Sequence, residues 1–284
     1  MSATFINIVK ERIIKSKSKV LIAGPYVGEF GWELMEWQGY VRKLKNFYDK
    51  IIVVSYKNRE YLYEDCIFLA HNFNLIKSKF AYGYIADDDR DKIIGDIVKK
   101  YSLINYDVLT PQNLNRLLIF FIGKQIHKKF YEPIRKNKRY NIVFHFRDFK
   151  RYDDDNKNID SQVSAALVDH FLNKNEKVAV IGHPKMSYCP PCADDCRSEN
   201  LLNDISIISN SDIVVGGSSA PMHLACLCGK PIVTWIGGGT DIERYISYWN
   251  PFKVPVYIVS DKTFQPNFKD IADKIQFALN QIRK

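Results

Sequence analysis

The sequence predicts an α/β protein with two domains, each built on a parallel sheet, that face each other across a cleft. Apolar segments of strand length alternate with amphipathic segments of helix length, and the alternation restarts after a basic polar run near residue 136. Strands that alternate with helices form parallel sheets with both faces covered, and their ligands bind beyond the carboxyl ends of the strands. We expect one domain over residues 1–136 and a second over residues 137–284.

The first half opens with a lysine-rich amphipathic helix, followed by a strand, a glycine-containing loop, a helix and a second strand. Continuous apolar runs mark the strands, and apolar or aromatic residues at helical spacing mark the helices. The predicted elements are a strand at 19–24, a helix at 34–47, a strand at 50–55, a helix at 89–101, a strand at 106–109, a helix at 114–130 and a linker at 134–140.

The second half restarts the same alternation. Its predicted strands are 141–146, 177–182, 212–215, 232–236 and 256–259, and its predicted helices are 160–173, 201–210, 221–228 and 268–282. His145 alternates with Val143 along the first of these strands, which predicts that its side chain packs inward.

Composition suits a chain with sizeable cores and disfavours several classes of protein. The chain has 284 residues, 46% of them hydrophobic, which fits one large or two modest domains at about 150 residues per domain. No segment approaches the roughly 18 apolar residues of a membrane-spanning helix and no signal peptide is visible, so we expect a cytoplasmic protein. Neither G-x-G-x-x-G nor a P-loop pattern occurs, which disfavours NAD-dependent and P-loop chemistry.

Positive charge is concentrated in the first half. Residues 1–140 hold 25 Lys and Arg against 15 Asp and Glu, whereas residues 141–284 hold 16 against 17. Such a surplus suits an anionic partner, namely nucleic acid, a phosphorylated glycolipid or a membrane surface, although a solvated basic surface gives the same count. We therefore expect the two halves to have different roles.

The cysteines offer one candidate metal site. Cys189, Cys192 and Cys196 form a C-x2-C-x3-C pattern that would supply three zinc thiolates, with His183 as the nearest fourth ligand. No partner pair follows at the usual spacing, so we favour a loop with incidental cysteines and predict no metal. In a cytoplasmic chain the six cysteines are expected to be thiols.

The segment 211–245 has the residue types of a phosphate-binding turn. An apolar strand enters Gly216 and Gly217, and Ser218 and Ser219 lead into a helix with Pro221 in its first turn. Glycine lets the backbone approach an anion, serine caps a helix, and the free N–H groups at the helix start suit a diphosphate. An ordinary strand–helix–strand unit with a tight turn would show the same glycines.

The same segment resembles the donor site of the bacterial heptosyltransferases, which are ADP-heptose:lipopolysaccharide glycosyltransferases of the GT-B fold. The shared pattern consists of an acidic residue, a strand, Gly, a Ser/Gly pair, a helix with His-Leu-Ala, Gly-Lys-Pro, a second strand and Gly-x-Thr-Asp. The matching residues are Asp212, Gly216, Ser218, Ser219, His223, Leu224, Ala225, Gly229, Lys230, Pro231, Thr240 and Asp241. The resemblance implies two Rossmann-like domains and a nucleotide-sugar donor, with His223 either touching phosphate or packing.

The family opens with a strand, a glycine-rich loop that carries an acidic residue, and a helix; the resemblance implies that this acidic residue is the catalytic base. This chain has the strand and the loop but no Gly-Asp pair. Glu29 and Glu33 are the substitutes, and we expect one of them to take the proton of the acceptor hydroxyl.

Transfer from a nucleotide sugar also needs positive charge beside the leaving diphosphate. Arg147 directly follows a predicted strand, so its guanidinium is expected at the carboxyl edge of the sheet, with Lys150 nearby. His183 ends another strand and is a candidate contact for the nucleobase. Asp241 and Glu243 are candidates for hydrogen bonds to sugar or ribose hydroxyls. We expect metal-independent transfer and no cofactor beyond the nucleotide-diphosphate sugar.

The acceptor is left open by the sequence. GT-B enzymes generally handle the acceptor in the N-terminal domain, where the positive charge lies, so an anionic acceptor is expected. Lipopolysaccharide core at a membrane face and DNA with a hydroxymethylated base both fit; the second would require base flipping, with Tyr26 or Trp32 as stacking partners. A nucleotide-sugar 2-epimerase and a binding module with a decayed site are the alternatives to a transferase.

Overall fold

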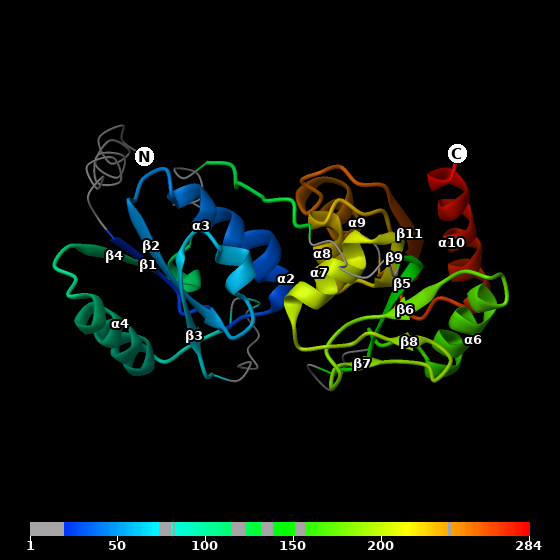
Figure 1. Ribbon diagram of the computed structural model, residues 1–284, viewed down its shortest axis with the longest axis horizontal. Helices are drawn as coiled ribbons and strands as arrows, with labels where there is room; N and C mark the ends of the chain where they lie inside the picture. Colours follow the sequence, from blue (N-terminus) through cyan, green and yellow to red (C-terminus); the bar gives the residue numbers. More distant parts are fainter. Residues whose placement is uncertain are drawn as a thin grey trace. The chain divides into compact units, whose positions relative to one another are not determined.

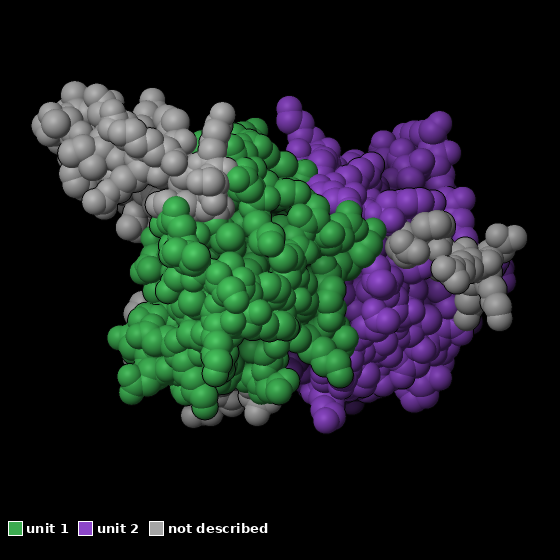
Figure 2. Space-filling view, turned by 60° about the vertical axis from the view of Figure 1, so that its left-hand side comes forward, with its two compact units in different colours: residues 1–127 green, residues 128–284 purple. Residues whose placement is uncertain are grey.

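The computed structural model describes residues 20–73, 81, 83–114, 123–131, 139–150, 157–237 and 240–284, and the structural statements below concern these residues. The chain divides into two compact units, residues 1–127 and 128–284, which we call unit 1 and unit 2 (Figures 1 and 2). The boundary expected after residue 136 falls in 132–138, outside the described residues.

Unit 1 is built on a sheet of four parallel strands. The strands are β1 (Val20–Ala23), β2 (Lys50–Tyr56), β3 (Ile67–His71) and β4 (Tyr106–Leu109). Their order in the sheet is β3-β2-β1-β4, so the chain moves outward from β1 to β3 and then returns to the other side of β1. The chain leaves β1 toward β2 on one side and comes back to β4 on the other side, so the topological switch point of this sheet lies between the carboxyl ends of β1 and β4.

Helices cover both faces of this sheet (Figure 1). A helical run begins at Phe30 and consists of α2 (Phe30–Trp32), a π-helical turn η1 (Glu33–Trp37) and α3 (Gln38–Leu44). On the opposite face, α4 (Asp87–Tyr101) packs Ile93, Ile94 and Ile97 against the side chains of Ile22, Ile52 and Val54 from β1 and β2. Two short 3₁₀ helices, η2 (Glu60–Tyr63) and η3 (Pro111–Asn113), follow β2 and β4.

Unit 2 contains a larger sheet. Its strands are β5 (Tyr140–Arg147), β6 (Val178–Val180), β7 (Ser187–Tyr188), β8 (Asp194–Asp195), β9 (Ser211–Gly217), β10 (Ile232–Ile236) and β11 (Val256–Ser260). The parallel order is β11-β10-β9-β5-β6-β8, and β7 pairs antiparallel with the end of β5. Here β6 lies on one side of β5 and β9 on the other, so the switch point lies between β5 and β9.

The helices of unit 2 form a layer on each face of the sheet. They are α6 (Ser161–Leu172), α7 (Leu201–Ser209), α8 (Ala220–Leu227), α9 (Thr240–Glu243) with the π-helical turn η4 (Arg244–Tyr248), and α10 (Phe268–Ile282). One layer, α6 and α10, buries Phe171 and Ile275 against alternate strand residues such as Phe144. The opposite layer includes α8, which carries six buried residues. This doubly covered arrangement confirms the predicted α/β class.

The structure corrects several predicted elements. Strand β3 was not predicted, and neither were the two-residue strands β7 and β8. The helix predicted at 114–130 lies partly outside the described residues, and its described part, 123–130, is irregular, with Gly123 at φ +80°. The helix predicted to begin at Leu34 begins at Phe30 and contains a π-helical turn.

Gly95 gives a test of the fold. It lies inside α4, is exposed, and a Cβ placed on it would meet nothing within 4 Å. Gly95→Ala is therefore expected to stabilise unit 1 by about 0.5–1 kcal/mol, because alanine costs less backbone entropy in a helix. Urea unfolding measures the change. Gly83→Ala is the matched control and should destabilise, since Gly83 has φ +72° and its Cβ would collide with the carbonyl oxygen of Val27. A destabilised Gly95→Ala variant would contradict the packing described for α4.

Candidate functional site

The switch point of unit 2 brings the predicted donor residues to one edge. Parallel register pairs His145 of β5 with Gly216 of β9, so Arg147, the last residue of β5, and Ser218, the first residue after β9, lie at the ends of two adjacent strands. Ligands of open α/β sheets bind outside the carboxyl ends of the strands at the switch point. The structure therefore supplies a topological reason to place a ligand beside these residues.

Gly216 and Gly217 are required by close packing of the protein itself. A Cβ on Gly216 would lie 2.8 Å from the carbonyl oxygen of His145 and 2.9 Å from Cε of Met222. A Cβ on Gly217 would lie 2.8 Å from the indole nitrogen of Trp235. Such distances exclude a side chain, so both glycines allow β5, β9, β10 and α8 to approach one another at the switch point.

Ser219 links the start of α8 to β5. It occupies the N-cap position with an extended backbone, but its hydroxyl does not cap the helix, contrary to expectation. Instead its Oγ lies 3.1 Å from Nδ1 of His145 and donates to the carbonyl oxygen of Gly217 at 2.9 Å. The neighbouring Ser218 donates its backbone N–H to Trp235 and accepts a 3.3 Å hydrogen bond from the Tyr245 hydroxyl. Both serines are half-buried and lie where α8 begins.

Two histidines beside this edge are buried and stay neutral. His145 is 6% exposed, which confirms the expected inward packing, and burial together with the charge of Arg147 lowers its pKa to about 4. His223 is 5% exposed, and burial, assisted by Arg244 and Lys157, lowers its pKa to about 3. Neither imidazole carries positive charge at neutral pH.

His223 lies in an aromatic cluster. Its ring stacks on Tyr245, with centroids 4.9 Å apart and planes 19° from parallel, and meets Trp249 edge-on at 4.7 Å. Of the two readings of this residue, these contacts correspond to packing, and they join α8 to the π-helical turn η4. Phosphate binding by His223 stays a prediction.

The positive charge at the edge comes from arginine and lysine. Arg147 donates from Nη1 to Oδ1 of Asn158 at 3.1 Å, and Lys150 lies on an exposed loop. Two further cations lie near α8 and were not predicted from the sequence: Lys157 and Arg244, which both lower the pKa of His223. Lys157 Nζ lies 5.3 Å from the ring centroid of Phe264, and that ring lies against Gly237, at the end of β10.

The remaining predicted donor residues lie apart from this group or have partners of their own. Nδ1 of His183 accepts from the backbone N–H of Lys185 at 3.1 Å, and its Nε2 lies 3.4 Å from the Glu199 carboxylate. Glu243 is exposed on α9. The side chain of Asp241 is outside what the structure describes.

In unit 1, Glu29 lies at the corresponding edge. The loop that follows β1 ends at Glu29, which has an extended backbone and directly precedes α2. Its carbonyl oxygen accepts a 2.7 Å hydrogen bond from the Tyr26 hydroxyl, and its backbone N–H donates to Ala81 at 2.8 Å. The residue is half-buried and ends the switch-point loop.

Glu33 has a different environment. It is fully buried, and its Oε1 accepts hydrogen bonds from Ser55 at 2.5 Å and Tyr63 at 2.9 Å. Burial raises the pKa of Glu33, while Arg59, 3.7 Å from its Oε2, opposes that shift. Arg59 also stacks over Phe30, 3.5 Å from the ring centroid. These contacts tie η1 to β2 and η2, so the Glu33 carboxylate has a role in packing within unit 1.

Both candidate regions contain a π-helical turn. One, η1, follows Glu29 after three residues, and the other, η4, directly follows α9. Such turns are rare and occur frequently at functional sites. Tyr26, offered above as a stacking residue, is instead fully buried, with its ring 5.9 Å from that of Trp37.

The described residues contain no group of three or more His, Cys, Asp or Glu side chains placed to hold a metal ion. All six cysteines are unpaired, and burial raises the pKa of Cys189 to about 11. Tyr140 contacts Cys196 through its hydroxyl, 3.4 Å from Sγ. In the part of the chain that is described, no helix is long and apolar enough to cross a membrane.

Several solved glycosyltransferases are similar to this chain in structure. The family 9 glycosyltransferase of Veillonella parvula aligns with a TM-score of 0.61 at 9% identity, over 94% of this chain and 98% of that one. For the ADP-heptose LPS heptosyltransferase II of E. coli, the TM-score is 0.61 at 10% identity, over 94% and 100% of the chains. The E. coli heptosyltransferase WaaC with ADP gives 0.52 at 10% identity, over 93% and 99%.

At these identities the likeness concerns the fold. It confirms the expected GT-B fold with two Rossmann-like domains. No protein-family model and no curated protein matches the sequence.

Acid is expected to destabilise unit 2 through its buried histidines. In the unfolded chain their pKa is near 6.5, against about 4 for His145 and about 3 for His223 in the folded chain. Unfolding then takes up protons, so the stability is complete above pH 6.5 and falls through the window from pH 6.5 to 4, by roughly 1.4 kcal/mol per pH unit for each histidine. Urea unfolding at pH 7.5, 5.5 and 4.5 measures this slope. His223→Phe should make it shallower, and an unchanged slope would contradict the neutral burial of His223.

Proposed function

We propose that the chain is a glycosyltransferase that moves a sugar from a nucleotide-diphosphate sugar to a hydroxyl of an anionic acceptor. The observation that carries the proposal is the switch point of unit 2, where the end of β5 and the start of α8 bring Arg147, Ser218 and Ser219 to adjacent strand ends. This arrangement occurs in a fold shared with heptosyltransferases. A diphosphate is the ligand whose charge and shape fit such an edge.

In the proposed donor site, the diphosphate binds beyond β5 and β9. Backbone N–H groups at the start of α8 and the hydroxyl of Ser218 donate to its oxygens, the hydroxyl of Ser219 exchanges its bond to the Gly217 carbonyl for one to a phosphate oxygen, and Arg147 grips the diphosphate bidentately. As the bond from the anomeric carbon to the diphosphate breaks, negative charge grows on the leaving oxygen, and these donors stabilise it. Lys157 and Arg244, which lower the pKa of His223, add positive charge nearby, and we propose that Lys150, on the exposed loop after β5, adds to it. We propose that transfer is metal-independent because these groups supply the charge that a metal would provide.

The ends of neighbouring strands would hold the rest of the donor. Asp241 and Glu243 remain our candidates for the sugar or ribose hydroxyls, and His183 for the nucleobase. The E. coli neighbour with ADP and the ADP-heptose LPS heptosyltransferase support an adenine nucleotide and a heptose. His223 would then act indirectly, by packing α8 against Tyr245.

For the acceptor step, we propose Glu29 as the base. The acceptor hydroxyl gives its proton to the Glu29 carboxylate while its oxygen attacks the anomeric carbon and the diphosphate departs. Glu29 is favoured over Glu33 because it is half-buried on the switch-point loop, whereas Glu33 is fully buried among Ser55, Tyr63 and Arg59.

The acceptor is proposed to be a phosphorylated lipopolysaccharide-type glycan. The surplus of basic residues within 1–140 suits its phosphates, and the E. coli neighbour is an LPS heptosyltransferase. DNA with a hydroxymethylated base has the same charge; of its two proposed stacking residues, Tyr26 is fully buried and Trp32 is half-buried.

Arg147→Ala tests the donor site. Loss of a bidentate, charge-assisted contact is expected to weaken ADP binding by at least about tenfold, with unchanged thermal unfolding, and Arg147→Lys should recover part of the affinity. Calorimetric titration with ADP, UDP and GDP measures the change and identifies the base. Lys177→Ala is the matched control, because Lys177 is exposed at the amino end of β6, at the opposite edge of the sheet. Equal affinity of Arg147→Ala and the parent protein would remove Arg147 from the site.

Glu29→Gln tests the transfer step. Turnover is expected to fall by about 10²- to 10⁴-fold with ADP affinity unchanged, because glutamine cannot accept the proton. The assay follows ADP release and sugar transfer from ADP-heptose, with a phosphorylated lipopolysaccharide core and hydroxymethylated DNA as alternative acceptors. Glu60→Gln, at an exposed position in η2, is the control. Glu33→Gln should instead lower the stability of unit 1. Full turnover in Glu29→Gln would refute its role as base.

A further inference from the structure

The guanidinium of Arg147 is held by an uncharged side chain. Its Nη1 donates a 3.1 Å hydrogen bond to Oδ1 of Asn158, and the same oxygen accepts the backbone N–H of Phe149 at 3.4 Å. Both Arg147 and Asn158 are half-buried. Because a free arginine side chain samples many rotamers, this contact with the end of β5 restricts the positions that the guanidinium can take.

Asn158 is itself fixed by contacts with the rest of unit 2. Its carbonyl oxygen accepts a 2.5 Å hydrogen bond from Nε2 of Gln265. The next residue, Ile159, is buried in the core of unit 2. Asp160 then begins α6, and its Oδ1 accepts two backbone N–H groups of the first helical turn. The position of the Asn158 side chain is therefore set by the fold, before any ligand binds.

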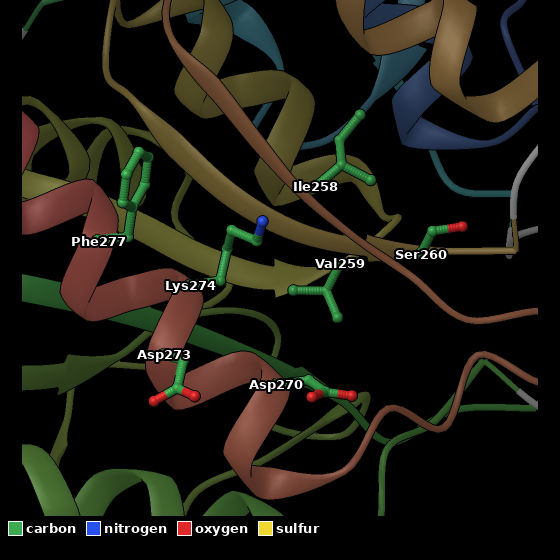
Figure 3. A pocket seen from close by; sticks show the side chains of 7 residues that line it. All are labelled: Ile258, Val259, Ser260, Asp270, Asp273, Lys274 and Phe277. Carbon is green, nitrogen blue, oxygen red and sulfur yellow. The ribbon is translucent and has the colours of Figure 1, made fainter.

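Gln265 belongs to the loop that follows β11. This strand runs beside α10, along a groove of about 470 Å³, and ends at Ser260 (Figure 3). Beyond it, Oδ1 of Asp261 accepts the backbone N–H of Thr263 at 2.7 Å, and Oγ1 of Thr263 accepts that of Gln265 at 3.2 Å. Since β5, β9, β10 and β11 are parallel, this ordered loop lies at the same edge of the sheet as Arg147.

The chemistry of this partner matters because an amide carries no charge. A carboxylate in the same place would accept the same hydrogen bonds, but its negative charge would repel an anionic ligand of the arginine. The nearby carboxylate of Asp160 accepts N–H groups of α6 instead. Among the described residues, Nδ2 of Asn158 has no hydrogen-bond partner, so this side chain adds a donor and no negative charge to the edge.

We propose that Asn158 is a positioning residue of the donor site, which orients the guanidinium of Arg147 for the diphosphate without adding negative charge beside it. The inference rests on the proposed function, because it concerns the same diphosphate contact. In the bound state Nη1 of Arg147 keeps its bond to Asn158, and other N–H groups of the guanidinium donate to phosphate oxygens. As negative charge grows on the leaving oxygen, an arginine that is already oriented stabilises it without reorganisation.

Asn158→Asp tests the proposal, because aspartate keeps the shape and the acceptor oxygen of asparagine and adds negative charge. Calorimetric titration uses whichever of ADP, UDP and GDP the full-length parent protein binds best, together with the corresponding monophosphate. The dissociation constant of the diphosphate is expected to rise by at least about tenfold, and that of the monophosphate by less, with thermal unfolding unchanged. Asn158→Ala, which releases the guanidinium, should weaken diphosphate binding by roughly threefold or more.

Asn173→Asp is the matched control, because it makes the same substitution at an exposed residue at the other end of α6 and should leave both affinities unchanged. If Asn158 were only structural, Asn158→Asp would bind the diphosphate as the parent does, or would weaken both nucleotides equally; either result would overturn the proposal. Full binding by Asn158→Asp beside weak binding by Arg147→Ala would remove only the role of Asn158. Parent-like binding by Arg147→Ala would remove the diphosphate contact itself, and this inference with it.

Discussion

The parallel pairing of β5 with β9 is the contact on which the candidate donor site depends. It sets the switch point of unit 2 and brings Arg147 to the same edge as Ser218 and Ser219. The pairing is close because Gly216 has no side chain to collide with the His145 carbonyl or with Met222. A Cβ there would collide with the His145 backbone carbonyl and force β5 and β9 apart. The geometry of the edge is thus a product of packing before any ligand is present.

The same packing places the neutral buried histidines and the basic side chains in different parts of this edge. His145 and His223 lie inside the edge, and desolvation keeps their imidazoles neutral. Arg147 and Lys150 lie on the strand end and the loop that follows it, outside this buried layer. The side chains that would face a diphosphate are therefore distinct from the two histidines, whose burial in the neutral form makes the stability of the supporting core depend on pH. The hydrogen bond between His145 and Ser219 joins the buried histidine to the start of α8.

The fold class could be predicted from sequence because it depends on local periodicity, which strands β5, β9 and β10 display plainly. Strand β3 was missed because its apolar run is short and follows the charged pair Glu64–Asp65, so its assignment depends on pairing with β2. Gly216 and Gly217 were predicted from the sequence as part of a phosphate-binding turn. Their surroundings in the structure show that close packing also requires glycine at both positions, and this packing depends on strands that are distant in sequence. Lys157 was missed because its neighbour Phe264 is far away in sequence.

Glu29 and Glu33 show why a periodic sequence pattern cannot decide which of two neighbouring carboxylates is the better candidate for the catalytic base. They are separated by one helical turn, and sequence gives both a place near the loop after β1. Glu29 precedes the helix with an extended backbone, so its side chain stays with the loop. Glu33 is the first residue of a π-helical turn and points into contacts with Ser55 of β2 and Tyr63 of η2. A buried carboxylate needs a compensating charge, and Arg59 provides it from a position stacked on Phe30. The residues that make Glu33 part of the core therefore also fix the start of the helix, and with it the place of Glu29.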